Sequence, residues 1–197
     1  MKIILDAGHG GLLNGVYQTA GKRSLTEIDG EWYYEGVGNR RFVREIASGL
    51  RVYGYDVGYT VRPEDPTDIS LKDRVKIVNE IAKKQEAILI SIHSNGYVNE
   101  QANGHEVFTC VGASSKSDLL ADLWLDNYFK LVKQKNRGHK KANFYMIKNT
   151  ICPAILIELA FHTNPEEVRL LRSWEYKIDV SLAVLNTIKD YETRKTR

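Results

Sequence analysis

Apolar and polar residues alternate along this chain in patterns that predict both strands and helices. Short apolar or alternating runs bounded by turn residues predict strands, at residues 2–6, 55–61, 87–92, 105–110, 144–147 and 154–157. Apolar residues at helical spacing predict helices, at residues 36–53, 71–81, 119–132, 165–171 and 174–191. Alternating strands and helices are typical of α/β proteins, so we expect one three-layer domain, with helices on both faces of a mostly parallel or mixed twisted sheet.

The predicted domain spans residues 1–197 as a single unit, because no repeat, linker or domain boundary divides it. Residues 192–197 are mostly charged and are expected to form a solvated tail. Between the first strand and the first helix, residues 12–34 show no clean period and are rich in glycine, asparagine, serine and threonine. Structureless loops of this length are uncommon in compact domains and are often functional.

Composition excludes several classes of protein. The 197 residues are 43% hydrophobic and 27% charged, which is globular usage and excludes collagen, long coiled coil and wholesale disorder. A net charge of +3 falls short of the basic surface of a dedicated nucleic-acid binder, so we expect no nucleic-acid partner. No apolar run approaches the roughly 18 residues that indicate a membrane span, so we expect no membrane partner. Two cysteines, Cys110 and Cys152, do not make a disulfide framework and are expected to be free thiols.

The first residues bear on where the protein is expected to be made. Met1 and Lys2 are followed by only three apolar residues before Asp6, whereas the apolar core of a secretory signal needs about 7–15. We therefore expect synthesis in the cytoplasm without a signal peptide.

Polar side chains follow three of the predicted buried strands. His9 follows the predicted strand at residues 2–6, His93 follows the one at residues 87–92, and Glu158 follows the one at residues 154–157. Open α/β sheets bind ligands beyond the carboxyl ends of their strands, so we expect these side chains to converge. Two histidines and one carboxylate are typical of a catalytic zinc site that leaves its fourth position to water.

A zinc hydrolase also needs a second carboxylate as general base, outside the ligand set. The sequence must therefore supply two carboxylates, a ligand and a base. Glu158 is one of them. Glu27, Glu31 and Glu35 are the available choices for the other, because they follow the loop that carries His9.

Four blocks of sequence then point to a known family. Residues 6–11 (DAGHGG), 91–95 (SIHSN), 104–108 (GHEVF) and 157–167 (IELAFHTNPEE) resemble the zinc N-acetylmuramoyl-L-alanine amidases of the amidase-3 type, in the same order and over essentially the whole chain. The resemblance implies hydrolysis of the amide bond between N-acetylmuramic acid and L-alanine in peptidoglycan. Peptidoglycan is thus the expected partner and Zn²⁺ the expected cofactor. The protein would reach the bacterial cell wall during phage lysis or by non-classical export.

The resemblance also implies roles for individual residues. Carried over, His9, Glu35 and His93 are the zinc ligands and Glu158 is the catalytic base. Glu35 is chosen as the middle ligand because it runs straight into the predicted helix, where the family places its glutamate. Glu27 and Glu31 remain the alternatives.

Further residues are expected to support the site. Asp6 is expected either to orient His9, since zinc-bound histidines donate their second N–H, or to tether the loop. Asn95, Glu106 and Asn143 are expected to contact substrate. The remaining three histidines are expected to lie outside the ligand set. His162 is expected to be a supporting or packing residue, and His105 and His139 are expected to lie at the surface or to have their hydrogen bonds satisfied within the protein.

Two other functions fit the same residues less well. A zinc peptidase of carboxypeptidase type would share the chemistry and cleave a different amide. A non-catalytic peptidoglycan-binding module would share the fold, but the full set of two histidines and two glutamates argues against it.

Overall fold

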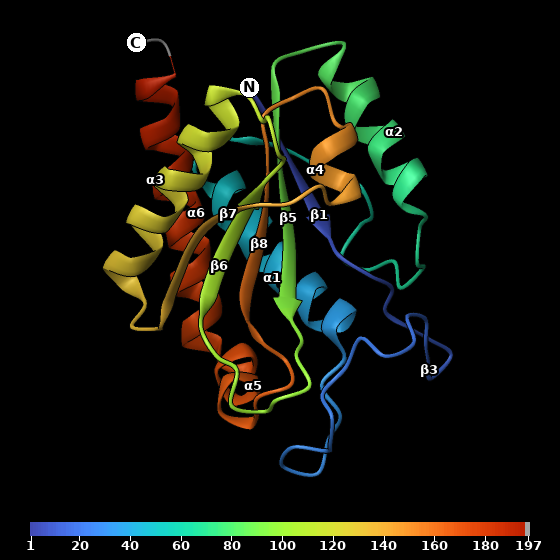
Figure 1. The fold of residues 1–197 in the computed structure, drawn as a ribbon. Helices are drawn as coiled ribbons and strands as arrows, with labels where there is room; N and C mark the ends of the chain where they lie inside the picture. Colours follow the sequence, from blue (N-terminus) through green and yellow to red (C-terminus); the bar gives the residue numbers. More distant parts are fainter. Residues whose placement is uncertain (196–197) are drawn as a thin grey trace.

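The computed structural model describes residues 1–195, and its central element is a six-stranded twisted sheet (Figure 1). The strands lie in the order β4-β1-β5-β8-β6-β7. Their bounds are β1 Lys2–Ala7, β4 Asp56–Tyr59, β5 Ala87–Asn95, β6 His105–Thr109, β7 Asn136–Lys141 and β8 Ala154–Phe161. The first four in spatial order are mutually parallel, β6 is antiparallel to β8, and β7 is parallel to β6. The predicted mixed, mostly parallel sheet is confirmed.

Helices cover both faces of this sheet, as expected for a three-layer α/β domain (Figure 1). One face packs on α1 (Glu35–Val52), α3 (Ser115–Leu131) and α6 (Trp174–Arg194). The other face packs on α2 (Leu71–Ala82) and α4 (Tyr145–Asn149). The short α5 (Pro165–Arg172) follows the carboxyl end of β8. Both faces of the central strands are buried, which explains why these strands are continuous apolar runs.

Alternation along β1 shows how one strand serves both layers. Ile3 and Leu5 belong to the larger apolar cluster, under α1, α3 and α6, whereas Ile4 belongs to the smaller cluster under α2 and α4. Asp6 follows Ile4 on the second face, and it is buried although it is charged. The strand therefore changes from core to polar chemistry at its carboxyl end.

One local prediction is wrong, and one strand was not predicted. Residues 144–147, expected as a strand, form the N-cap and first turn of α4. Met146 and Ile147 are consecutive and both buried, which a helix turn allows and strand alternation does not. Strand β7 was not predicted, because its sequence NRGHKK has no apolar alternation. It lies at the edge of the sheet, where charged side chains are tolerated.

The segment 12–34 is irregular, as predicted, apart from the two-residue strands β2 (Leu12–Leu13) and β3 (Val16–Tyr17). The expected charged tail is helical over its first part, because α6 runs to Arg194, and residues 196–197 lie outside the described range. Within residues 1–195, no helix has both the length and the apolar character needed to cross a membrane.

Candidate metal centre

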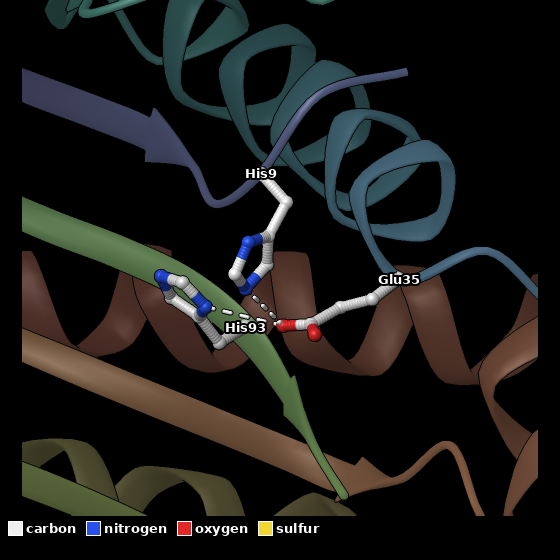
Figure 2. A group of neighbouring side chains, drawn as sticks. All are labelled: His9, Glu35 and His93. Atoms are coloured by element: carbon white, nitrogen blue, oxygen red, sulfur yellow. Dashed lines mark hydrogen bonds and ion pairs between the residues drawn. The ribbon is translucent and has the colours of Figure 1, made fainter. Parts of the chain in front are cut away.

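Three side chains converge at the carboxyl-terminal side of β1 and β5 (Figure 2). His9 follows β1 as expected, whereas His93 lies within β5, because this strand runs on to Asn95 and not only to residue 92. The Oε1 atom of Glu35 lies 3.2 Å from Nε2 of His9 and 3.1 Å from Nδ1 of His93. One ligand atom from each residue can be chosen so that all three lie within 4.8 Å of one another. The two imidazole rings meet edge to face, with centroids 5.1 Å apart. The structure thus gathers residues that the sequence separates by more than 80 positions.

Glu35 reaches this point because it is the first residue of α1, whose N-terminal end faces the sheet edge (Figure 2). Its carboxylate is buried, and its Oε2 atom has no hydrogen-bond partner in the described chain. Burial acts to raise the pKa of Glu35, but hydrogen bonds and charge from His9 and His93 outweigh it and hold the pKa well below its usual value. The alternative residues Glu27 and Glu31 are exposed on the loop and stand outside the group.

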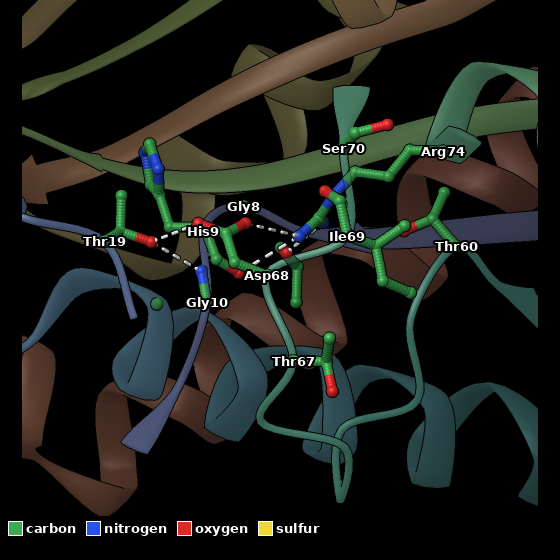
Figure 3. A network of polar contacts seen from close by, with 12 residues as sticks. Gly8, His9, Gly10, Thr19, Thr60, Thr67, Asp68, Ile69, Ser70 and Arg74 are labelled. Carbon is green, nitrogen blue, oxygen red and sulfur yellow. Dashed lines mark hydrogen bonds and ion pairs between the residues drawn. The ribbon is translucent and has the colours of Figure 1, made fainter. Parts of the chain in front are cut away.

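His9 is held by its backbone. Its φ of 66° lies in the left-handed region, which is uncommon for a residue with a side chain. The His9 carbonyl accepts a hydrogen bond from Arg74 at 3.1 Å (Figure 3). It also accepts one from Arg40 at 2.7 Å, so two buried guanidinium groups fix this turn. Gly8 leaves room for the His93 side chain, because a Cβ at residue 8 would lie 2.1 Å from the ring of His93.

Asp6 precedes this loop on β1, and its carboxylate forms hydrogen bonds with residues other than His9. Its carboxylate accepts hydrogen bonds from Arg74 at 2.8 Å, from Ser91 at 2.6 Å and from Thr60. Burial raises the pKa of Asp6, but these partners together lower it below its usual value. Through Arg74, which also binds the Ala7 and His9 carbonyls, Asp6 tethers the loop. This geometry corresponds to the second of the two roles expected for Asp6.

Glu158 lies on β8 directly opposite His93 on β5. Its Oε2 atom is buried and has no hydrogen-bond partner among the described residues. Burial, followed by the negative charges of Glu35 and Glu106, raises the pKa of Glu158 well above its usual value. Glu158, His9 and His93 line the same cavity, of about 210 Å³. A carboxylate with a raised pKa beside a candidate metal centre is suited to accept and return a proton.

The residues expected to contact substrate lie at different places. Asn95 donates a hydrogen bond to Glu106 at 2.6 Å, and Glu106 is also paired with Arg137 and Lys140. Glu106 is the strand partner of Glu158, so this cluster borders the site. Asn143 is exposed and accepts a hydrogen bond from the Cys110 thiol, and it is not among the residues lining the cavity.

The other histidines have separate surroundings. Nδ1 of His162 lies 3.8 Å from Oε2 of Glu35 and 2.8 Å from the Ser94 carbonyl oxygen, so His162 borders the candidate metal centre. Buried His105 contacts Trp124, and half-buried His139 contacts Asp122. These positions fit the supporting and satisfied roles expected from the sequence.

Sequence reasoning missed the side chains that hold the loop. Arg40 and Arg74 are buried, and Asn39 donates a hydrogen bond to the Gly8 carbonyl at 3.1 Å. The one available signal was Arg74, which lies on the inward face of the predicted helix 71–81, next to Val75 and one turn from Val78.

Residues 3–190 match the model of the amidase-3 family, described as N-acetylmuramoyl-L-alanine amidase. The chain belongs to this family. The resemblance predicted from the four sequence blocks and the enzyme class that it implies are therefore confirmed. This chain is an N-acetylmuramoyl-L-alanine amidase, a hydrolase of the bacterial cell wall.

Relatives of this amidase cover nearly its full length. It is 27% identical to N-acetylmuramoyl-L-alanine amidase AmiA of Escherichia coli (strain K12), over 96% of this chain and 75% of that protein. It is 27% identical to the germination-specific N-acetylmuramoyl-L-alanine amidase of Bacillus subtilis (strain 168), over 98% of this chain and 80% of that protein. The solved N-acetylmuramoyl-L-alanine amidase from Clostridium difficile 630 superposes with a TM-score of 0.83 at 28% identity, covering 98% and 97% of the two chains.

The donor set of this amidase fits zinc. Two imidazole nitrogens and one carboxylate oxygen are the ligand types of catalytic zinc sites, and they lie close enough to share one ion. The buried Oε2 atom of Glu35 has no hydrogen-bond partner among residues 1–195, which is a cost that a bound cation would offset.

Proposed function

We propose that this amidase hydrolyses the bond between N-acetylmuramic acid and L-alanine with zinc held by His9, Glu35 and His93, and with Glu158 as general base. The observation that carries the proposal is the cavity in which Glu158 faces the two histidines. When bound, zinc would polarise the amide carbonyl and activate the attacking water. The assignment of all four residues to the reaction is supported by this geometry and by the family membership.

Glu158 would carry the proton through the reaction. Its carboxylate takes a proton from the attacking water as the water oxygen bonds to the carbonyl carbon. The same carboxyl group then returns the proton to the amide nitrogen, so that the bond to L-alanine breaks with a neutral amine leaving. The raised pKa of Glu158 suits both steps, because it brings the proton affinity of the carboxylate closer to that of the groups it serves.

The remaining residues would keep the site in place. Arg40 and Arg74 fix the turn of His9, and Ser94 donates its backbone N–H to Glu35 at 3.3 Å. Glu106 is held beside Glu158 by two cations and is proposed, with Asn95, to border the bound substrate. We propose that the enzyme acts at the bacterial cell wall, the location named for its relative, the probable cell wall amidase LytH of Staphylococcus saprophyticus.

Metal content and turnover measured together test these assignments. Glu158→Gln is expected to retain zinc and to lose about 100- to 10,000-fold in turnover, the usual size of a general acid–base contribution. Glu35→Ala is expected to lose zinc, whereas Glu31→Ala, the matched control on the exposed loop, is expected to keep it. An active Glu158→Gln enzyme would show that the base lies elsewhere. If Glu35→Ala kept zinc at full affinity, the middle ligand would move to Glu27 or Glu31.

Mass spectrometry of digested peptidoglycan tests which bond is cleaved. Free stem peptides that begin with alanine are expected. Shortened stem peptides still joined to sugar would indicate a peptidase, and unchanged peptidoglycan bound by the protein would indicate a binding module.

A further inference from the structure

The cavity that holds the candidate catalytic residues has a polar part and an apolar part. His9, His93 and Glu158 form its polar part. Apolar side chains form another part of its lining, and they are Leu71, Phe144, Tyr145, Met146 and Leu156. Lys22 is the one lysine or arginine among the lining residues that the structure describes. A substrate entering this cavity therefore meets a single fixed positive charge besides the candidate metal.

The backbone of Lys22 is attached to the metal centre. Its carbonyl oxygen accepts the N–H of Glu35 at 2.9 Å, so the irregular loop is fixed at this residue to the start of α1. The side chain of Lys22 takes no part in this bond and is exposed. Substituting the side chain should thus leave the position of the loop unchanged.

The ammonium group of Lys22 is available to a ligand. Within residues 1–195 no carboxylate lies within ion-pairing distance of it, whereas the adjacent Arg23 is engaged, with its guanidinium 4.0 Å from the centre of the Trp32 ring. Burial and then the charges of Glu35 and Glu106 raise the pKa of Glu158, and the charge of Lys22 acts in the opposite direction, so this charge reaches the cavity. Two neighbouring cations therefore differ: one faces the cavity and the other stacks on a ring.

Building on the proposed function, we propose that Lys22 binds a carboxylate of the stem peptide beside the cleaved amide, and so selects peptides whose second residue carries a free carboxyl group. That residue follows the L-alanine whose nitrogen is released, and two residues span at most about 7 Å. In peptidoglycan the second residue is glutamate with a free α-carboxylate or its amide, isoglutamine. An ammonium group distinguishes these two, because only the carboxylate forms an ion pair with it.

Two substrates and four enzymes test the proposal. The substrates are soluble N-acetylmuramoyl-L-alanyl stem peptides that differ only at the second residue, D-glutamate or D-isoglutamine, and share the same C-terminal carboxylate. The enzymes are the wild type, Lys22→Met, Lys22→Arg and Arg23→Met, all as zinc-loaded full chains, with kcat and KM measured for each pair. Because the C-terminal carboxylate is common to both substrates, any difference reports on the second residue.

The wild type is expected to prefer the glutamate peptide by about tenfold in KM, the size of a charge-assisted contact that remains partly in water. Lys22→Met is expected to bring this ratio close to one, whereas Lys22→Arg and Arg23→Met should keep it. A ratio that is equal in the wild type and Lys22→Met overturns the proposal while leaving the amidase assignment intact. A wild type that releases alanine peptides from neither substrate overturns the proposed function and this inference with it.

Discussion

Buried His105 makes the stability of the fold depend on pH. The Nε2 atom of His105 accepts the Trp124 indole N–H at 2.8 Å, so this nitrogen has no proton, and its ring stacks on Tyr128 with centroids 3.8 Å apart. Its Nδ1 faces the Leu159 carbonyl. The ring is therefore neutral in the folded protein. Burial lowers the pKa of His105 from 6.5 to about 3.

The sign and size of the effect follow from proton linkage. In the unfolded chain His105 takes up a proton as the pH falls below 6.5, whereas in the folded chain it stays neutral down to about pH 3. Acidification in this window therefore favours the unfolded state. Between pH 7 and pH 5 the free energy of unfolding should fall by about 2 kcal/mol on account of His105 alone. That is a large fraction of the roughly 5–15 kcal/mol that stabilises a domain.

Urea unfolding of the metal-free protein at pH 7, 6 and 5 measures this change. The variant His105→Gln should be less stable at pH 7, because it disturbs the contacts of Trp124, but its free energy of unfolding should fall about 2 kcal/mol less on going to pH 5. From pH 7.5 to pH 9 the difference between the two proteins should be constant, which is the control. Parallel curves from pH 7 to pH 5 would refute the reasoning.

Two further predictions concern the loop that carries His9. Arg74→Met leaves the buried Asp6 carboxylate without its cation and should lower the free energy of unfolding by about 3–5 kcal/mol in a urea titration. Adding Asp6→Asn to the same chain should restore part of this stability. A loss below about 1 kcal/mol would contradict a stabilising role for the buried ion pair. Gly8→Ala places a Cβ 2.1 Å from the His93 ring and should displace that ring. Zinc retention against a chelator should weaken by tenfold or more, because a loss of about 1.4 kcal/mol in binding free energy corresponds to a factor of ten. Gly49→Ala, which crowds Ser181 instead, is the control expected to keep zinc, and equal retention by the two variants would contradict the prediction.

Apolar runs predicted the centre of the fold because its strands are buried on both faces. Residues 2–6, 87–92 and 154–157 correspond to β1, β5 and β8. His9 follows β1, whereas His93 and Glu158 are paired within β5 and β8, which extend beyond the predicted ends to Asn95 and Phe161. The position of a parallel strand end follows from topology, so the convergence could be predicted without coordinates.

Other features have no signal in a pattern of apolar residues. Strand β7 is formed by pairing with β6, and its own residues are polar. The sequence offered three glutamates as the middle ligand, and only the structure shows that Glu35 is buried against both histidines. The choice among them depends on how the loop returns to α1, which is set by contacts such as that from Glu35 to the Lys22 carbonyl.

The parallel pairing of β1 with β5 and of β5 with β8 also has a kinetic consequence. Each pair joins segments separated by more than 60 residues, and such long-range pairing makes folding slow. The candidate ligands His9 and His93 come together only when β1 and β5 have paired, so a binding-competent site cannot form before this long-range pairing. A metal ion that binds only this assembled site stabilises the native state without speeding its formation. Zinc bound at this site should therefore lengthen the lifetime of the folded enzyme against unfolding, which is a kinetic form of stability.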